Sequence, residues 1–303
     1  MIPFERLNLN QREAYEQILT PCDRQGCEYL FVNKFLWGRQ KVAFFGENLV
    51  FFSQFDRRSI YPFPVGSGDL KPALDAVIQD ARERGIPCNI TGMTEGDCAL
   101  LEKLYPGQFR FHTDRDDFDY VYSIDDLAEL KGRKYQKKRT HLNRFLQEHP
   151  NYRTMELDEH NRAQAYCMLQ RWYAQREILN PEVDFHLEKL AMDRAFAFQK
   201  QLGLEGIVLM DEDEVLAFAM GSFLNQDTFD IHFEKAREDV PGAYNAINRE
   251  FARHLRAKYP QLRWLNREDD MGLEGLRKAK LSYYPDHMVE KYWAKRWEEE
   301  YDG

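Results

Sequence analysis

The feature that most constrains the fold is an order of predicted elements that occurs twice along the 303-residue chain. In each copy, an antiparallel meander is followed by a glycine-containing loop, a helix, a strand, a second helix and a last strand. The first copy runs from Tyr29 to Tyr122 and the second from Leu204 to Tyr292. No residue-level repeat accompanies this order. The sequence therefore predicts a duplicated α/β unit, of α+β type, with a helical insertion between the copies.

Local signals place the elements of the first copy. Residues 28–33, 40–45 and 48–53 are rich in aromatic and β-branched residues and are predicted as strands, the last two joined by a turn at Gly46. Asp69 is expected to cap a helix that ends at Gly85. We expect two domains: residues 1–122, and residues 123–303 with the helical insertion.

Composition limits the classes of function. The net charge of −9 argues against a general nucleic-acid binder and so against DNA as a partner. No apolar stretch approaches the roughly 18 to 20 residues of a membrane span, and the N-terminus lacks the apolar segment of a secretory signal. We therefore expect a cytoplasmic protein. The five irregularly spaced cysteines are expected to be free thiols.

A basic segment, residues 131–144, contains seven Lys or Arg and no acidic residue. One interpretation is an anion site for the phosphates of a nucleotide or an RNA backbone, or for a lipid headgroup. The other is a solvated helix whose charge offsets the acidic residues just upstream. The residues assigned to the anion or RNA site are Lys131, Arg133, Lys134, Lys137, Lys138 and Arg139.

Recognised catalytic motifs are absent from the sequence. It contains no Ser-His-Asp motif, Walker loop, dinucleotide fingerprint or spacing of metal ligands, so no metal is expected. The histidines His160, His186 and His232 lie far apart, and we interpret each as structural. Nothing in the sequence indicates an oligomeric state.

Two segments resemble the phosphatidylglycerol lysyltransferase C-terminal domain family. Residues 118–122, with Leu127, Leu130 and the basic residues up to Asn143, are similar to its central signature. Residues 266–285, which include Asn266–Asp269, Gly272, Gly275–Arg277, Lys280, Ser282–Tyr283 and Pro285, are similar to its C-terminal signature. The resemblance implies two packed copies of the GNAT (acetyltransferase-like) fold. It also implies transfer of an aminoacyl group from aminoacyl-tRNA, or of an acyl group from coenzyme A.

The family resemblance suggests roles for residues of the second copy. Backbone N–H groups at the start of one helix would hold donor phosphates, and Arg277 and Lys280 would bind an anionic part of donor or acceptor. Glu268 or Asp269 would be the general base, with Tyr283 as proton donor. The residues assigned to donor binding are Gly242, Ala243, Tyr244, Asn245, Arg277 and Lys280.

Two departures from the family pattern bear on the substrate. The chain lacks the membrane-spanning region of the lipid-modifying members, so a soluble amine or hydroxyl acceptor is expected. The loop of residues 237–243 lacks the first glycine of the usual coenzyme A loop, which weakens acyl-CoA as donor. The alternative is a non-catalytic protein of the same fold that binds tRNA or a nucleotide through its basic helix.

Overall fold

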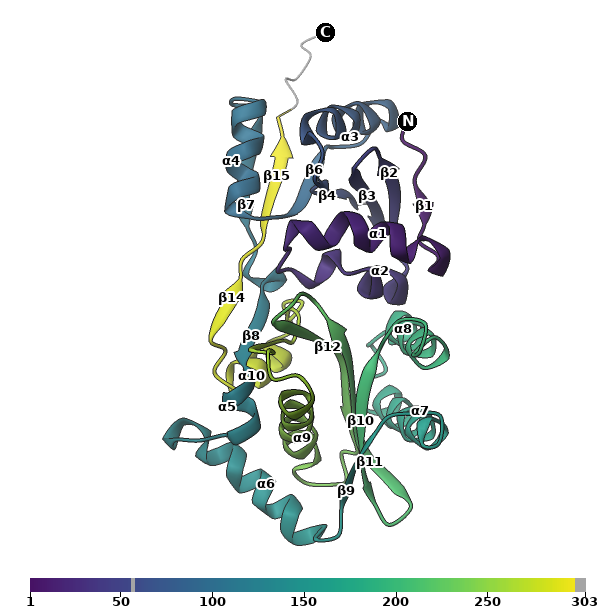
Figure 1. The fold of residues 1–303 in the computed structure, drawn as a ribbon, viewed down its shortest axis with the longest axis vertical. Helices are drawn as coiled ribbons and strands as arrows, with labels where there is room; N and C mark the ends of the chain where they lie inside the picture. The colour runs from purple at the N-terminus through teal and green to yellow at the C-terminus, as the bar shows by residue number, and fades with distance from the viewer. Residues whose placement is uncertain (56–57, 298–303) are drawn as a thin grey trace. The chain divides into compact units, whose positions relative to one another are not determined.

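The computed structural model describes residues 1–55 and 58–297, which divide into two compact units. The first unit contains Met1–Asp119, Asp269–Leu273 and the chain from Val289 onwards, and the second contains Tyr120–Glu268 and Glu274–Met288. The expected boundary near residue 122 therefore lies three residues from the observed change of unit. The assignment of all later residues to the second domain is wrong, because the last strand joins the sheet of the first unit (Figure 1).

The first unit is a mixed sheet with helices on both faces. Its strands lie in the order β1-β2-β3-β4-β6-β15-β7, with β5 beside β3, and its only parallel pair among the described residues is β4–β6. The strands are β1 (Glu5–Arg6), β2 (Gln40–Phe45), β3 (Asn48–Phe55), β4 (Arg58–Pro62), β5 (Val65–Gly66), β6 (Asn89–Met93), β7 (Phe109–Thr113) and β15 (Tyr292–Arg296). The helices are α1 (Arg12–Leu19), α2 (Phe31–Trp37), α3 (Leu70–Arg84) and α4 (Glu95–Leu104).

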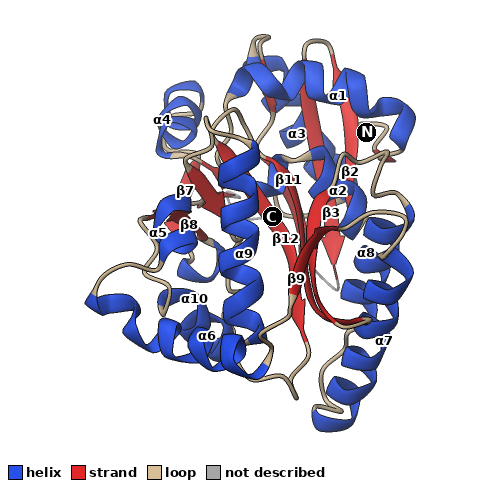
Figure 2. Ribbon diagram, turned by 60° about the horizontal axis from the view of Figure 1, so that its bottom comes forward, coloured by secondary structure: helices blue, strands red, loops and turns tan. Residues whose placement is uncertain are grey.

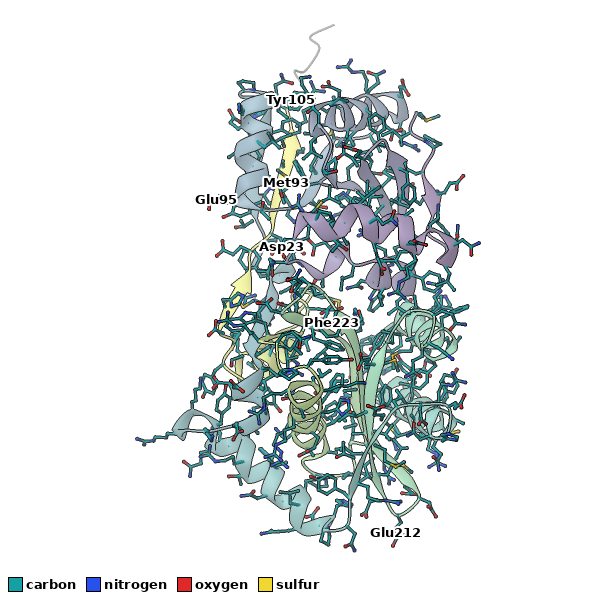
Figure 3. The ribbon with its side chains drawn as sticks, in the orientation of Figure 1. Asp23, Met93, Glu95, Tyr105, Glu212 and Phe223 are labelled. Carbon is teal, nitrogen blue, oxygen red and sulfur yellow. The ribbon has the colours of Figure 1, made fainter. Side chains whose placement is uncertain are left out.

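Alternation along β3 divides the core of the first unit between two faces. Val50 and Phe52 join the cluster that contains the apolar residues of α3. Phe51 points to the other face, where its ring centroid lies 6.3 Å from that of Tyr15 in α1. Asp69 caps α3 through the N–H of Lys71, as predicted. Tyr105, labelled in Figure 3, follows α4, and its hydroxyl donates a 2.6 Å hydrogen bond to Asp75 on α3.

Residues 28–33, predicted as a strand, are helical instead. Cys27–Tyr29 forms a 3₁₀ turn, and α2 begins at Phe31 and ends at Trp37, before Gly38, which has a positive φ of 62°. A short run of buried apolar residues has no periodicity that separates a buried helix from a strand. The left-handed residue after Trp37 was the signal of a helix end that the strand interpretation overlooked.

The second unit repeats the layered plan. Its sheet has the order β14-β8-β13-β12-β11-β10-β9, with β12 and β13 parallel. The strands are β8 (Asp119–Ser123), β9 (Arg153–Glu156), β10 (Glu205–Asp211), β11 (Glu214–Phe223), β12 (Thr228–Ala236), β13 (Trp264–Asn266) and β14 (His287–Val289). The helices are α5 (Ile124–Glu129), α6 (Gln136–Glu148), α7 (Arg162–Leu179), α8 (His186–Ala197), α9 (Ala243–Lys258) and α10 (Glu274–Leu281).

Helix α9 covers one face of this second sheet, and α7 and α8 cover the other (Figure 2). On the α9 side, Phe223 packs its ring edge-on against Phe229 and Tyr259. Each sheet contains a parallel pair that is joined through a helix, β4–α3–β6 in the first and β12–α9–β13 in the second. The duplicated order predicted from the sequence is thus a duplicated crossover unit. No helix of the described chain combines the length and apolar character that crossing a membrane requires.

Lys34, on α2, provides a test of the first unit's core. Its ammonium lies 4.1 Å from the ring centroid of Phe51, and burial lowers its pKa to about 7 from the ordinary 10.5. The folded state therefore disfavours the protonated form, and this penalty grows as pH falls from 10.5 and is complete below about 7. We expect Lys34→Met to raise the free energy of unfolding at pH 6 by about 2 kcal/mol. The gain should shrink at pH 9.5. Urea denaturation at both pH values measures this gain in the free energy of unfolding, with the exposed Lys41→Met as control. Equal gains at the two pH values would contradict the lowered pKa of Lys34.

Candidate functional site

The candidate site lies where two parallel strands of the second unit separate. β12 pairs with β13 only through Thr228–Asp230, although β12 continues to Ala236. Against β11, the register passes from Phe233 opposite Met220 to Ile231 opposite Gly221, so His232 is an extra residue in a bulge. Bulges redirect side chains and are common beside active sites. Beyond the last paired residue, the space between the strands is filled by polar side chains from β12, α9 and the loops after β13 and α10.

Glu234 on β12 and Arg267 after β13 form the centre of this polar cluster. Arg267 Nη2 lies 3.1 Å from Glu234 Oε1, and Asn248 Nδ2 donates to Glu234 Oε2 at 3.2 Å. The side chains of Arg267 and Glu234 are only 14% and 11% exposed. Arg267 Nη1 and Asn248 Oδ1 are buried without a hydrogen-bond partner in the described chain. The two residues contact the same carboxylate, and a buried donor and a buried acceptor left open on them suit a ligand that carries both functions.

Tyr283 and Lys138 form the other side of the cluster. The Tyr283 hydroxyl accepts a 2.8 Å hydrogen bond from Asn245, and Lys138 Nζ lies 3.7 Å from the Tyr283 ring centroid. Burial, with a smaller effect of Glu234, raises the pKa of Tyr283, so its phenol is neutral and can donate a proton. Burial and the nearby Arg267 guanidinium lower the pKa of Lys138 to about 8.

The lowered pKa predicts unusual reactivity for Lys138. At pH 8, about half of this amine is neutral, whereas an ordinary lysine is less than ~1% neutral. We expect a limiting dose of acetic anhydride at pH 8 to acetylate Lys138 several-fold faster than Lys137, the exposed lysine beside it on α6. Peptide mass spectrometry after short exposures measures both rates. Equal rates at pH 8 would contradict the prediction.

The residues predicted as general bases stand in different surroundings. The Glu268 carboxylate lies 3.2 Å from His232 Nδ1 in the second unit. Asp269 belongs to the first unit and accepts a hydrogen bond from the N–H of Met271. Lys280, predicted to bind an anion, is buried and donates from Nζ to the backbone oxygens of Arg267 and Glu268 at 2.6 and 3.1 Å. Lys280 thus holds the loop that carries Arg267, while Arg277 is half-buried on α10.

The predicted phosphate-binding loop before α9 is closely packed. Gly242 has φ 82°, and a Cβ there would lie 2.2 Å from the backbone oxygen of His141 on α6. Ala243 is buried, and its N–H donates to Val240 O at 3.2 Å. Among the predicted donor-binding residues at the start of α9, Asn245 reaches the polar cluster with its side chain, through Tyr283.

Some residues of the basic segment make structural contacts, and others are exposed on the surface. Lys131 pairs with Glu129 and Lys134 with Asp126, as expected if the charges offset upstream acids. Arg139 donates to the backbone oxygens of Leu130 and Gly132, which follow α5. Lys138 belongs to the polar cluster. Arg133 and Lys137 are exposed on the surface and remain available for an anionic ligand.

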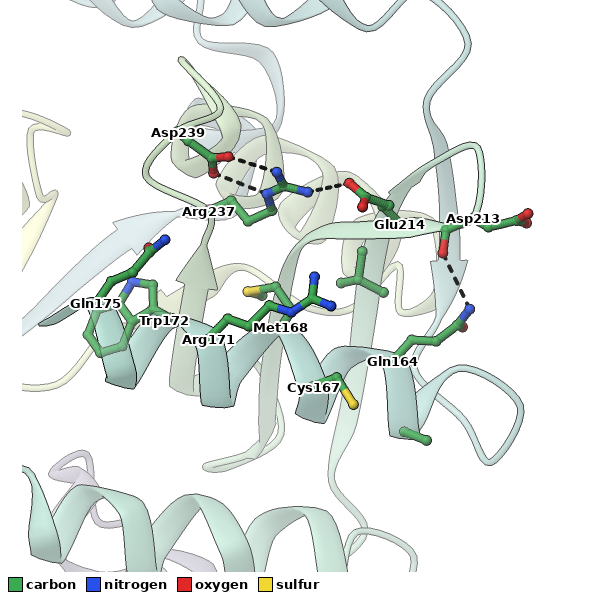
Figure 4. Close-up of a pocket in the computed structure, with 12 residues that line it drawn as sticks. Gln164, Cys167, Met168, Arg171, Trp172, Gln175, Asp213, Glu214, Arg237 and Asp239 are labelled. Atoms are coloured by element: carbon green, nitrogen blue, oxygen red, sulfur yellow. Dashed lines mark hydrogen bonds and ion pairs between the residues drawn. The ribbon is translucent and has the colours of Figure 1, made fainter.

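A separate cavity of about 400 Å³ lies between α7 and the β10–β11 turn at Glu212 (Figures 3 and 4). Arg237 lines it and is held by Asp239 at 2.7 Å and by Glu214. Arg171 and Cys167 project from α7 into the same space. None of the residues to which the sequence analysis assigned a role lines this cavity.

The sequence interpretation missed Glu234 and Asn248, interpreted His232 as structural, and quoted Arg267 within a motif without assigning it a role. Glu234 and His232 lie in an ordinary strand pattern, and Asn248 lies on a helix. The one available signal was the charged Arg267 directly after an apolar strand, where functional loops are common.

The fold and the site define the class of protein. The second unit carries a helix-linked parallel strand pair that separates around a polar cluster, the first unit repeats the same crossover, and the whole is a tandem GNAT-like fold. The chain belongs to the family described as phosphatidylglycerol lysyltransferase, C-terminal, whose model matches residues 20–295. The family and fold expected from the sequence are thereby confirmed.

The chain is also similar to solved structures and to a curated relative. A conserved protein of unknown function from Bacteroides thetaiotaomicron is 35% identical, with 98% of this chain and 100% of that chain covered and a TM-score of 0.90. L-PGS from Bacillus licheniformis shares the fold at 16% identity, with 98% and 94% coverage and a TM-score of 0.67. An uncharacterised protein of Mycoplasmoides gallisepticum is 26% identical over 178 residues, which span 58% of this chain but only 56% of that protein.

Proposed function

We propose that the second unit transfers an aminoacyl group from aminoacyl-tRNA to an amine or hydroxyl acceptor. The observation that carries the proposal is the open pair of buried atoms beside Glu234. The Glu234 carboxylate and Asn248 Oδ1 suit an α-ammonium group, and Arg267 Nη1 suits the neighbouring carbonyl oxygen. A plain acyl chain has no ammonium group and would leave Asn248 Oδ1 without a donor, which disfavours acyl-CoA.

The roles of the remaining residues follow from the chemistry of an ester donor. The acceptor nitrogen or oxygen attacks the aminoacyl carbonyl and a tetrahedral oxyanion forms. Its collapse breaks the bond to the ribose oxygen and releases the tRNA. Arg267 would stabilise that oxyanion. Glu268 would take the proton of the acceptor, and the neutral Tyr283 phenol would protonate the departing ribose oxygen. Arg133 and Lys137 would contact the tRNA backbone.

The packing of the loop before α9 supports the same choice of donor. Gly242 lies against α6, and the Ala243 N–H already donates to Val240 O, so at least one of the predicted backbone donors is not open to a pyrophosphate. L-PGS from Bacillus licheniformis shares this fold, but a shared fold does not identify the acceptor of this chain.

The test is a transfer assay with total tRNA charged with radiolabelled amino acids. The protein is incubated with charged tRNA and, in separate arms, phosphatidylglycerol vesicles or a mixture of soluble amines. Loss of the ester with label in either acceptor fraction supports the proposal and identifies the kind of acceptor. Turnover of acetyl-CoA alone would overturn the choice of donor. Salt-dependent tRNA binding without turnover would favour a non-catalytic binding protein.

A further inference from the structure

A row of hydrogen-bonding side chains in the second unit runs from β11 through β12 to the loop after β13. Ser222 on β11 lies 2.9 Å from His232 Nε2, and His232 lies in the bulge of β12. His232 Nδ1 lies 3.2 Å from Glu268 Oε1 and 3.4 Å from Asp230 Oδ2. The side chains of His232 and Asp230 are 1% and 0% exposed, whereas Glu268 is 20% exposed. The row is therefore buried at all positions except the one at Glu268.

The neighbours of His232 determine its tautomer. The two carboxylates at Nδ1 can only accept hydrogen bonds when ionised, so Nδ1 carries the proton. Nε2 is then an acceptor, and the Ser222 hydroxyl donates to it. A serine, a histidine and an acid in this order form the familiar arrangement of an activated nucleophile. Here, however, Ser222 is the buried end and the carboxylate is the end that substrate can reach.

The backbone of Glu268 shows that this carboxylate is held in place. Glu268 has φ 57°, an unfavourable value for a residue with a side chain. Its N–H donates to Asn266 Oδ1 at 2.7 Å, and its carbonyl accepts from the N–H of Tyr120 and from Lys280 Nζ, both at 3.1 Å. Strained residues that their surroundings hold in several ways are concentrated at functional sites.

We propose that His232 is a positioning residue, which aims the general base Glu268 through its Nδ1–H while Ser222 fixes its tautomer. This inference rests on the proposed transfer reaction. In the reaction, Glu268 accepts the acceptor's proton as the new bond to the carbonyl carbon forms and the ester bond breaks. The ribose oxygen receives its proton from Tyr283. Ser222 and His232 stay unmodified throughout, so neither a seryl ester nor a proton stored on the imidazole is required.

Two substitutions of His232 separate its two hydrogen bonds. In His232→Asn, the amide nitrogen occupies the place of Nδ1 and can still donate to Glu268. In His232→Gln, the amide group occupies the place of Nε2, and the donor to Glu268 is lost. We expect His232→Asn to keep kcat within about five-fold of the unsubstituted protein and His232→Gln to lose about 30-fold or more, with KM little changed in both. Equal losses in the two variants would overturn the proposal.

Two further measurements make the proposal independent of the acceptor's identity. Nitrogen-15 NMR of the unsubstituted protein should show His232 protonated at Nδ1, and protonation at Nε2 instead would overturn the inference even if no transfer is found. Mass spectrometry during turnover should find no acyl group on Ser222. An ester at Ser222 would make it the nucleophile and overturn the positioning role. Absence of turnover with every donor, with Nδ1 protonated, would reject the proposed function alone.

Discussion

Replacing Glu234 by Gln should reduce kcat/KM for an aminoacyl donor by about 100-fold or more. The substitution keeps the shape of the side chain and removes the charge that faces Arg267 at 3.1 Å and Asn248 at 3.2 Å. An amide cannot neutralise the α-ammonium of the donor, and it leaves the Arg267 guanidinium without its counter-charge. Steady-state assays with charged tRNA, in which the loss of label from tRNA is followed, measure the change.

Two controls make the Glu234 result specific. Glu214→Gln removes a charge from the exposed edge of the separate cavity, where the carboxylate is 64% exposed, and should change kcat/KM less than two-fold. Glu234→Asp keeps the charge but shortens the side chain, so an intermediate loss is expected. A Glu234→Gln protein that remains folded and transfers at the unsubstituted rate would exclude Glu234 from the binding of the donor's amine.

Local sequence signals predicted most of the fold. Capping residues such as Asp69 and the repeated order of elements define helices and crossovers through interactions between near neighbours, and these are readable from spacing. The strand predicted at residues 28–33 failed because burial on all sides removes periodicity. The pairing of β15 with the first sheet could not be predicted, because strands that pair across nearly 200 residues have no local sequence signal of their partner.

The candidate site was less predictable for a related reason. Tyr283 and Asn245 were predicted from a family resemblance, and they do meet, 2.8 Å apart. Glu234 and Arg267 face each other because β12 continues beyond its pairing with β13 and the chain leaves the sheet after Asn266.

The role of Lys280 was also not readable from the sequence. Lys280 looked like a surface cation beside Arg277, yet it is buried against backbone oxygens. Charge alone cannot distinguish a ligand-binding lysine from one that supports a loop.

Lys291→Met should lower the free energy of unfolding of the first unit by about 3–5 kcal/mol. Lys291 Nζ lies 2.6 Å from Asp119 Oδ1 and 2.9 Å from Glu28 Oε2, and its side chain is 8% exposed. Burial alone would lower its pKa, but Asp119, Cys27 and Glu28 raise that pKa well above the ordinary value. The ammonium is therefore charged throughout the neutral range, and its contribution is lost only when pH rises far above 10.5.

The cause of this loss is the burial of the two carboxylates rather than the packing of the lysine stem. Methionine fills a similar volume, but it removes the cation between Asp119 and Glu28. Urea denaturation at pH 7 should show the loss, and Lys295→Met, at an exposed position in β15, should change stability by less than about 0.5 kcal/mol. Combining Lys291→Met with Asp119→Asn should cost less than the sum of the single changes, because the amide removes the uncompensated charge. Additive losses would show that Lys291 and Asp119 stabilise the unit independently.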